Sequence, residues 1–517
     1  MRDTRSIHLL AALAVIGVAH VAVAAPRCEK SCKAETTGCI ADRCAGLGGQ
    51  AERECVETCK GIGGCARIGT VAWVMSTCTE RGYEQKLQIR RGDCDPVTVL
   101  DFPEPSLSLP CDLIGSLRFG FATEPPTGAF HRLGVSPDGK RVVFEVTDDF
   151  SMLGPDHLVP AGQKEGIFVV QDDGHGLRLL GPASRDASFG ILGDPTAPGG
   201  FRAFIYTPLS FKPNGASVVL TDLGPGPGGE QAIQIFTLDI ATGTRTQLTH
   251  LPFEPPHPVG LVDLQKGTCC PVFLSNGRIS FLSFIDIDGL NPERDQVQFV
   301  MNSDGSGLER VPLPVVAGRR VVPIFQTTPA PAQRSATVLA VPGVPVNVEA
   351  GDTISEIFFF HRKSLLQLTN FGRTDTTTPD LTPDGKRVLF AASADPFGTN
   401  PSGTCQLFSV STEASGLHQL TRFSSPEHSV RGCLQTTPPG CRILPYGVEP
   451  ATATLVFYSS CDPFGTNPSG DQLFAISANG THLRQLTHAR GLFTDANGTV
   501  SAENIGPIGH SPIAGQY

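Results

Sequence analysis

Charged residues are scarce in this chain, and no run of like charge stands out. Only 17% of its 517 residues are Asp, Glu, Lys or Arg, and the formal net charge of −10 is spread without an acidic block. This balance gives no indication of a nucleic-acid partner or of an anionic membrane. In contrast, the chain contains 57 Gly and 43 Pro. So many turn-forming residues favour a turn-rich all-β protein over a helical or a disordered one.

Several motifs that mark common enzyme classes are absent. The sequence has no Gly-x-Ser-x-Gly nucleophile elbow, no glycine-rich phosphate loop and no dinucleotide-binding fingerprint. Its 13 histidines include no His-x-x-x-His pair, although His250 and His488 each follow a Leu-Thr pair. A metal-dependent enzyme would therefore need ligands that converge from distant segments.

The first 24 residues have the order of a secretory signal peptide. Arg2 and Arg5 precede the apolar run Leu9–Ala19, and Ala22-Val23-Ala24 supplies a small-residue cleavage site. The run is short for a transmembrane helix, and nothing later in the chain approaches the required length. We expect a periplasmic or secreted protein with no membrane span after the signal is removed; an uncleaved anchor is the alternative.

Sixteen cysteines in an exported chain indicate disulfide bonds. Residues 26–66 hold seven of them, and two pairs with a spacing of four, Cys28/Cys32 and Cys55/Cys59, flank a glycine-rich break at 46–49. Such spacing places each pair on one helical face, which predicts a small disulfide-stapled α-hairpin. Joining Cys28 to Cys59 and Cys32 to Cys55 would keep one register, and a zinc site is the alternative.

A second group of cysteines lies near the C-terminal end, at Cys405, Cys433, Cys441 and Cys461. We expect these residues to staple adjacent loops, with Cys433 and Cys441 closing a short loop between them.

Two nearly identical segments indicate a repeat protein. Residues 381–390 read Leu-Thr-Pro-Asp-Gly-Lys-Arg-Val-Leu-Phe, and residues 135–144 read Val-Ser-Pro-Asp-Gly-Lys-Arg-Val-Val-Phe. Pro fixes φ, Asp supports the bend and Gly accepts a positive φ, so each copy predicts a tight turn that leads into a β-strand.

The strand that follows each turn begins a longer pattern, visible in six copies between residues 130 and 490. The second strand is apolar, the third has a central aromatic residue, and the fourth is Leu-rich and often reads Gln-Leu-Thr. The second strands are predicted at 142–144, 218–220, 279–282, 337–340, 388–390 and 455–458. Four short strands repeated in this way predict a β-propeller, because one blade alone cannot bury its faces.

The repeat Ser/Thr-Pro-Asp-Gly-Lys-Arg-Val-x-Phe, followed by an Ile/Leu-Phe strand and Gln-Leu-Thr, resembles the TolB-type propeller repeat. The resemblance implies a propeller in the periplasm or outside the cell that binds proteins or peptides at the mouth of its channel. The α/β domain that precedes the propeller in TolB has no counterpart here. The α/β-hydrolase domain of the related prolyl oligopeptidases is also missing.

The number of blades depends on residues 70–121 and on the tail. Three predicted strands at 70–100 form a candidate first blade without an innermost strand, which residues 498–508 could donate to close the ring. Seven blades within residues 70–517 are favoured on this basis. The alternative is six blades with residues 70–121 packed outside.

One loop motif, Asp-x-x-Gly-x-Asn-Pro, occurs between the second and third strands of three blades. Its side chains are candidates for a ligand rim: Asp286, Asp288, Asn291, Asp395, Asn400, Asp462 and Asn467. Asp286 and Asp288 are also weak candidates for a calcium site, since their oxygens are closely spaced. The structural alternative, which we favour, is a turn in which Asp and Asn satisfy the backbone.

The sequence thus predicts an exported, non-enzymatic and monomeric scaffold that binds a protein, peptide or glycan through one loop face, with no cofactor other than this calcium candidate. The alternative is a metal-dependent hydrolase or lyase with its site at the central channel.

Overall fold

The computed structural model describes most of the predicted repeats. The described residues are 40–41, 44–46, 48–49, 52, 56, 69–79, 82–91, 96–103, 130–146, 166–184, 191–192, 209–253, 262–263, 268–274, 276–283, 285–291, 297–311, 315–316, 319–320, 336–342, 355–361, 364–371, 376–382, 384–424, 433, 441, 443–449, 453–467, 472–494 and 500–511. The predicted signal peptide and Cys28, Cys32, Cys55 and Cys59 lie outside these residues. Within the described ranges, no helix has the length and apolar character needed to cross a membrane.

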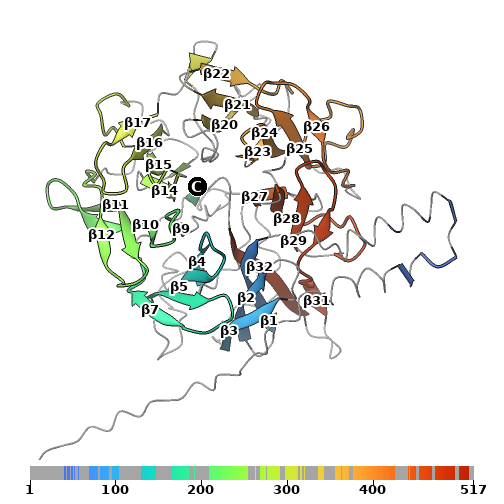
Figure 1. Cartoon of the computed structure of the whole chain (residues 1–517), viewed down its shortest axis with the longest axis horizontal. Coiled ribbons are helices and arrows are strands. Elements are labelled where there is room, and N and C mark those ends of the chain that lie inside the picture. The colour runs from blue at the N-terminus through green and yellow to red at the C-terminus, as the bar shows by residue number, and fades with distance from the viewer. Residues whose placement is uncertain are drawn as a thin grey trace, which may run out of the picture.

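Nearly all regular secondary structure of the described residues is β-strand, arranged in a ring of sheets, which confirms the predicted all-β propeller (Figure 1). Six sheets, named blades 2 to 7, consist of strands that are consecutive in the sequence. Blade 2 is β4 (Phe130–Val135), β5 (Arg141–Val146), β6 (Gly166–Gln171) and β7 (Arg178–Gly181); blade 3 is β9 (Ser210–Phe211), β10 (Ser217–Pro225), β11 (Gln231–Asp239) and β12 (Arg245–Gln247); blade 4 is β14 (Thr268–Phe273), β15 (Ile279–Ser283), β16 (Val297–Met301) and β17 (Glu309–Arg310).

On the other side of the ring, blade 5 is β20 (Ala336–Pro342), β21 (Ser355–His361) and β22 (Ser364–Gln367); blade 6 is β23 (Thr376–Leu381), β24 (Arg387–Ala392), β25 (Gln406–Ser411) and β26 (His418–Gln419); blade 7 is β27 (Ile443–Glu449), β28 (Thr454–Ser459), β29 (Gln472–Ser477) and β30 (Arg484–Gln485). The six second strands predicted from the sequence lie within β5, β10, β15, β20, β24 and β28.

The remaining position in the ring is filled by a sheet made from both ends of the repeat region, here named blade 1 (Figure 1). It joins β1 (Thr70–Thr79), β2 (Gly82–Arg91) and β3 (Val97–Pro103) to β31 (Gly491–Thr494) and β32 (Val500–Ser511), in the order β3-β2-β1-β32-β31. β32 lies antiparallel to β1 and supplies the innermost strand that the sequence assigned to the tail.

Side chains of β1 pack on both neighbouring blades. Val71 and Trp73 belong to an apolar cluster with blade 7, and Ala72 and Val74 belong to a cluster with blade 2. A strand that buries its two faces against two different blades is part of the ring. β1 therefore packs between blades 7 and 2, where the favoured seven-bladed arrangement places it.

The Pro-Asp-Gly motif forms the turn that the sequence predicts. Gly139 and Gly385 have φ values of 69° and 67°, which favour glycine. In the second copy, the Thr382 hydroxyl donates to Asp384 Oδ1 at 2.7 Å, and the Lys386 amide donates to the same oxygen at 3.1 Å. The Thr382 hydrogen bond is the main reason that the pKa of Asp384 lies below its usual value.

The Gln-Leu-Thr motif fastens the fourth strand of a blade to the third. In blade 6 the Thr421 hydroxyl accepts a hydrogen bond from the Leu407 amide and donates one to Gln406 Oε1, both at 2.9 Å. The Gln406 amide group also donates to the Phe423 carbonyl at 2.7 Å. The same hydroxyl-to-amide bond recurs in blades 3 and 7, between Thr249 and Gln234 and between Thr487 and Gln472.

Two short pairs of strands lie outside the blades: β8 (Ile191–Leu192) with β13 (Val262–Asp263), and β18 (Val315–Val316) with β19 (Arg319–Arg320). In the predicted hairpin region, Ile40 and Ala41 are helical, and the Cys44 amide donates to the Ile40 carbonyl at 3.0 Å. The hairpin itself remains a prediction.

Candidate functional site

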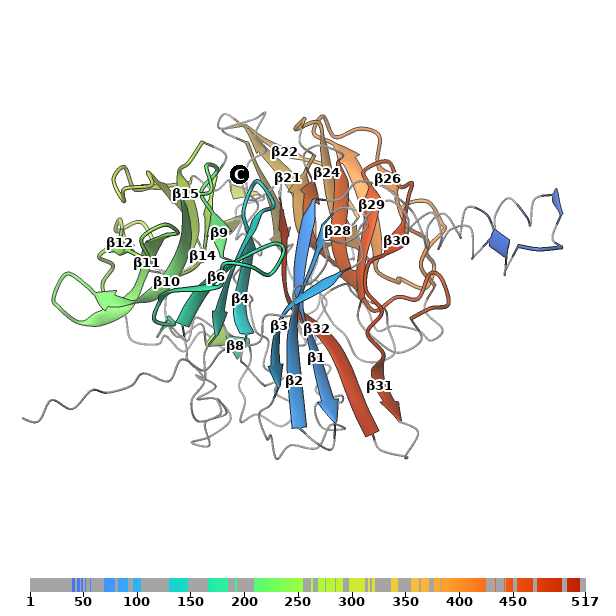
Figure 2. The ribbon, with the colours of Figure 1, turned by 60° about the horizontal axis from the view of Figure 1, so that its bottom comes forward.

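Loops of two kinds gather at one rim of the propeller. Because the strands of a blade alternate in direction, the loops between second and third strands lie at the same rim as the connections between blades. We name this the loop rim, and the opposite one, which carries the Pro-Asp-Gly turns, the turn rim. Figure 2 shows that β1, β2, β31 and β32 extend past the other blades, and the β1–β2 hairpin places this extension at the loop rim.

The Asp-x-x-Gly-x-Asn-Pro loops all lie at the loop rim, and their Asp and Asn residues make turn contacts. In blade 6 the Asn400 amide N–H donates to Asp395 Oδ1 at 2.7 Å. In blade 7 the Asn467 amide makes the same bond with Asp462, also at 2.7 Å. The aspartates are exposed at the surface, but Asn400 and Asn467 are buried.

The buried asparagines complete the turns with their side chains. The Asn400 side-chain amide donates to the carbonyls of Ala394 at 3.0 Å and Thr404 at 2.7 Å. The Asn467 side chain donates to the Cys461 carbonyl at 3.1 Å. These contacts support the structural interpretation of the motif, since a side chain already bonded to its own loop is poorly placed to bind a ligand.

The third copy of the motif, in blade 4, carries the calcium candidates. Asp286 Oδ1 accepts from the amide of the buried Asn291 at 2.6 Å, and Asp288 Oδ1 accepts from the Leu290 amide at 3.1 Å. Asp288 Oδ2 lies 3.2 Å from Arg310 Nε. Across the described residues, no three His, Cys, Asp or Glu side chains gather as they would around a metal ion. Asp288 thus lies beside an arginine, and the described residues bring no third acidic ligand to the two aspartates.

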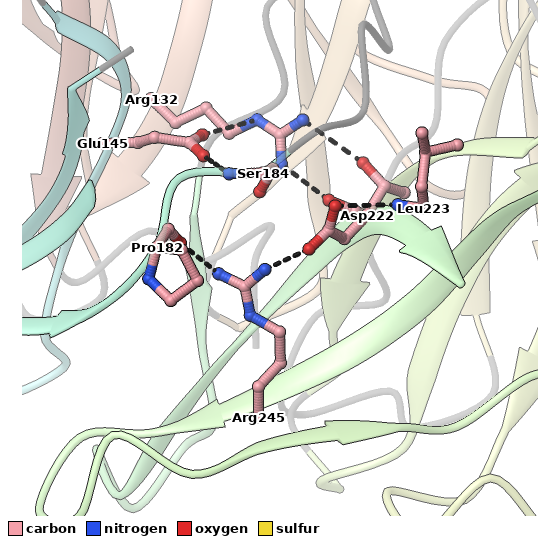
Figure 3. Close-up of polar contacts among 8 residues, drawn as sticks. Arg132, Glu145, Pro182, Ser184, Asp222, Leu223 and Arg245 are labelled. Atoms are coloured by element: carbon pink, nitrogen blue, oxygen red, sulfur yellow. Dashed lines mark hydrogen bonds and ion pairs between the residues drawn. The ribbon is translucent and has the colours of Figure 1, made fainter. Parts of the chain in front are cut away.

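A buried polar network supports the loop rim between blades 2 and 3 (Figure 3). Arg132 of β4 and Glu145 of β5 are 2% and 0% exposed, and Arg132 Nε lies 3.4 Å from Glu145 Oε2. Arg132 also donates to the Thr221 carbonyl of blade 3 at 3.2 Å, and the Ser184 amide donates to Glu145.

An arginine of blade 3 contacts blade 2 in the same way. Arg245 of β12 pairs with Asp222 of β10 and donates to the Pro182 carbonyl of blade 2 at 2.6 Å (Figure 3). Each arginine thus pairs with a carboxylate of its own blade and bonds a carbonyl of the other. The sequence analysis missed this network. Each of two apolar strands contains a charged residue, Arg132 or Glu145, and these charges could have indicated a buried ion pair.

The network lies at the loop-rim ends of the strands. Glu145 is the last residue but one of β5, and Ser184 follows β7. The β8–β13 pair joins the connections on either side of blade 3, with Leu192 opposite Val262. A rigid base of this kind is typical of scaffolds that hold binding loops.

Two disulfides fix the connection between blades 6 and 7. Cys405 pairs with Cys433, and Cys441 pairs with Cys461. The expectation that Cys433 and Cys441 close a short loop is therefore wrong. Each pairs instead with a cysteine beside the Asp-x-x-Gly-x-Asn-Pro loop of one adjacent blade, so the two bonds join the connection to both blades.

Large apolar side chains are exposed on three blades at the loop rim. Phe253, Leu290 and Phe397 are 54%, 62% and 49% exposed. Phe253 begins the connection after blade 3, and Leu290 and Phe397 lie in the loops of blades 4 and 6. Sequence analysis did not select them, although Leu290 and Phe397 lie inside the motif it singled out.

The exposure of Phe397 is not a property of its loop sequence. The loop of blade 7 repeats Asp-Pro-Phe-Gly-Thr-Asn-Pro-Ser-Gly, but its Phe464 is only 9% exposed and packs on Phe474, with ring centroids 6.4 Å apart. In blade 6 the equivalent Phe408 is contacted by Phe371 at 5.8 Å. Phe397 therefore points away from the core while its counterpart joins it.

Known structures that are similar to this chain are β-propellers or contain one. TolB from Acinetobacter baumannii is 12% identical, with 84% of this chain and 82% of that chain covered and a TM-score of 0.35. The β-propeller domain of the Trilobed protease from Pyrococcus furiosus is 10% identical (82% and 95% covered, TM-score 0.42). Oligogalacturonate lyase from Vibrio parahaemolyticus is also 10% identical (83% and 88% covered, TM-score 0.41).

No protein-family model matches the sequence, and no curated protein matches it significantly. At such low identities and TM-scores, no activity of these structures is carried over to this chain.

Proposed function

We propose that the protein is an exported, non-enzymatic β-propeller scaffold that binds a protein, peptide or glycan through its loop rim. The observation that carries the proposal is the exposure of Phe253, Leu290 and Phe397 at this rim. Exposed large apolar side chains on loops held by a rigid scaffold are common at binding surfaces. The buried network between blades 2 and 3 supports the same face, because it fixes the loop-rim ends of these two blades relative to each other.

Export is supported by the signal-like N-terminus and by the two disulfides, which are typical of proteins in oxidising compartments. The signal-like N-terminus and the disulfides support export whatever partner the protein binds.

The test compares two triple variants in partner capture from a periplasmic or extracellular extract of the source cells. The first changes Phe253, Leu290 and Phe397 to Ser. The matched control changes Leu179, Leu308 and Leu366 to Ser, which are 45%, 38% and 41% exposed but lie in or beside outermost strands. Loss of a specific partner in the first variant alone supports the loop rim. Equal capture by both variants and the wild type would place the binding surface elsewhere.

Asn400 and Asn467 are unsuitable for this test, although they belong to the predicted rim residues. Both are buried and bonded to their own loops, so their replacement would disturb the rim itself.

A further inference from the structure

Each exposed apolar side chain of the loop rim lies next to a carboxylate. The three pairs are Glu230 with Phe253, Asp288 with Leu290, and Asp395 with Phe397. One such neighbour would mean little, but the same combination occurs on three blades and in two kinds of loop.

The first pair is formed by two separate segments. Glu230 ends the 226–230 loop of blade 3, and its Oε1 accepts a hydrogen bond from the Phe253 amide at 3.2 Å. Backbone hydrogen bonds, first from Glu230 itself and then from Phe253, lower the pKa of this carboxyl. Glu230 therefore presents a negative charge beside the exposed Phe253 ring at neutral pH.

In the second and third pairs, one loop supplies both groups. Asp395 and Phe397 are both exposed and lie two residues apart in a turn closed by the Asp395–Asn400 hydrogen bond. In blade 4, Arg310 neutralises Asp288, so Leu290 contributes mainly apolar surface there. Among the described residues, neither Glu230 nor Asp395 has an arginine or lysine as an ion-pair partner.

We propose that the loop rim binds a protein segment that carries Lys or Arg side chains, with Glu230–Phe253 and Asp395–Phe397 as the two recognition points. This inference rests on the proposed function and specifies the chemistry of the partner. A Lys or Arg side chain can lay its aliphatic stem on apolar surface and direct its cationic head to a carboxylate. The phenyl faces of Phe253 and Phe397 add a cation–π contact.

The overall charge agrees with this chemistry. The chain carries a formal net charge of −10, which attracts a cationic segment during diffusion and repels an acidic one. Blades 4 and 5 lie between blades 3 and 6 in the ring, so one partner that reaches both points must span this sector of the rim (Figure 1).

The experiment measures binding of two fluorescent decapeptides to the full mature protein by polarisation, one rich in Arg and Leu and one rich in Glu and Leu. The double variant Glu230→Gln/Asp395→Asn keeps the side-chain oxygens that accept the backbone hydrogen bonds. Its matched control, Asp304→Asn/Glu413→Gln, removes the same charge from exposed turns on the turn rim of blades 4 and 6.

We expect the wild type to bind the Arg peptide only, with an affinity that falls as salt rises from 50 to 300 mM. The rim double variant should bind at least about fivefold more weakly, and the control should stay within about twofold of the wild type. Equal weakening in both double variants would show attraction to net charge alone, and binding of the Glu peptide would also overturn the inference.

The natural partner separates this inference from the proposed function. If the Phe253, Leu290 and Phe397 variant loses the partner while Glu230→Gln/Asp395→Asn retains it at low and high salt, the scaffold function stands and the cationic partner is wrong. If neither variant loses it, the proposed function itself fails.

Discussion

The carboxylate of Asp380, on the inner strand of blade 6, accepts a hydrogen bond from the backbone amide of Val448, on the inner strand of blade 7. Asp380 Oδ1 also accepts the Leu381 amide at 2.8 Å. Burial outweighs these hydrogen bonds and raises the pKa of Asp380 to about 7. An ionisable group therefore joins two blades in a place that favours its neutral form.

This pKa predicts a pH-dependent contribution to stability. Because the pKa is higher in the folded than in the unfolded state, the folded protein binds more protons between about pH 4 and pH 7. The contribution of Asp380 is fully present below this window and is lost as the pH rises through 7. Asp380→Asn keeps an oxygen acceptor and removes the titration, so its free energy of unfolding relative to wild type should rise by roughly 2–3 kcal/mol from pH 5 to pH 8.

Urea unfolding of both proteins across this pH range measures the difference. Asp384→Asn is the control in the same blade, because the pKa of Asp384 is lowered and its pH effect has the opposite sign. A constant difference between Asp380→Asn and wild type over the whole range would contradict the assigned pKa.

The sequence was sufficient to predict the architecture, because residues that are close together in the chain determine each turn and each strand. The Asp-Gly turn recurs in blades 2 and 6, apolar strands such as β24 recur around the ring, and the Gln-Leu-Thr motif has one backbone role in several blades. The site depended on contacts between distant segments. Whether Phe397 or Phe464 is buried depends on neighbouring rings, and identical loop sequences could not distinguish the two.

The Arg132–Glu145 pair should be costly to break from one side. Arg132→Met leaves the buried Glu145 carboxylate without this guanidinium, and we expect a loss of about 3–5 kcal/mol in the free energy of unfolding. The double variant Arg132→Met/Glu145→Gln should regain part of this loss, since the remaining charge is removed. Urea unfolding of the two single variants and the double variant gives the coupling energy. Additive losses would mean that the two side chains do not act as a pair.

We expect the Thr421 hydroxyl to contribute more to the stability of the fold than the hydroxyl of an exposed threonine. Thr421→Val removes a hydrogen-bond donor and an acceptor from a buried site, and we expect it to cost about 1–3 kcal/mol. Thr246→Val, on the exposed face of β12, is the matched control and should change stability by less than about 0.5 kcal/mol. Thermal unfolding of both variants measures the two losses. An equal loss of stability would contradict this role of the motif.

The disulfide pairing can be checked directly. Mass spectrometry of a non-reduced digest should yield peptides that link Cys405 to Cys433 and Cys441 to Cys461. Cys405→Ala/Cys433→Ala should lower the free energy of unfolding by about 3 kcal/mol, because the bond closes a loop with a sequence separation of 28 residues. A dominant peptide with Cys433 joined to Cys441 would contradict the structure.

Closure of the ring by β32 can be followed with a single probe. Trp73 is the only tryptophan of the chain and lies in the apolar cluster that Ile505 of β32 shares with blade 7. Ile505→Ala should leave a cavity at this seam and cost about 2–5 kcal/mol, since Ile505 is only 2% exposed. In a cooperative ring, the urea transitions followed by Trp73 fluorescence and by far-ultraviolet circular dichroism shift together. If only the Trp73 transition moves, blade 1 separates before the other blades unfold, and β32 acts as a local strand and not as the closure of the whole propeller.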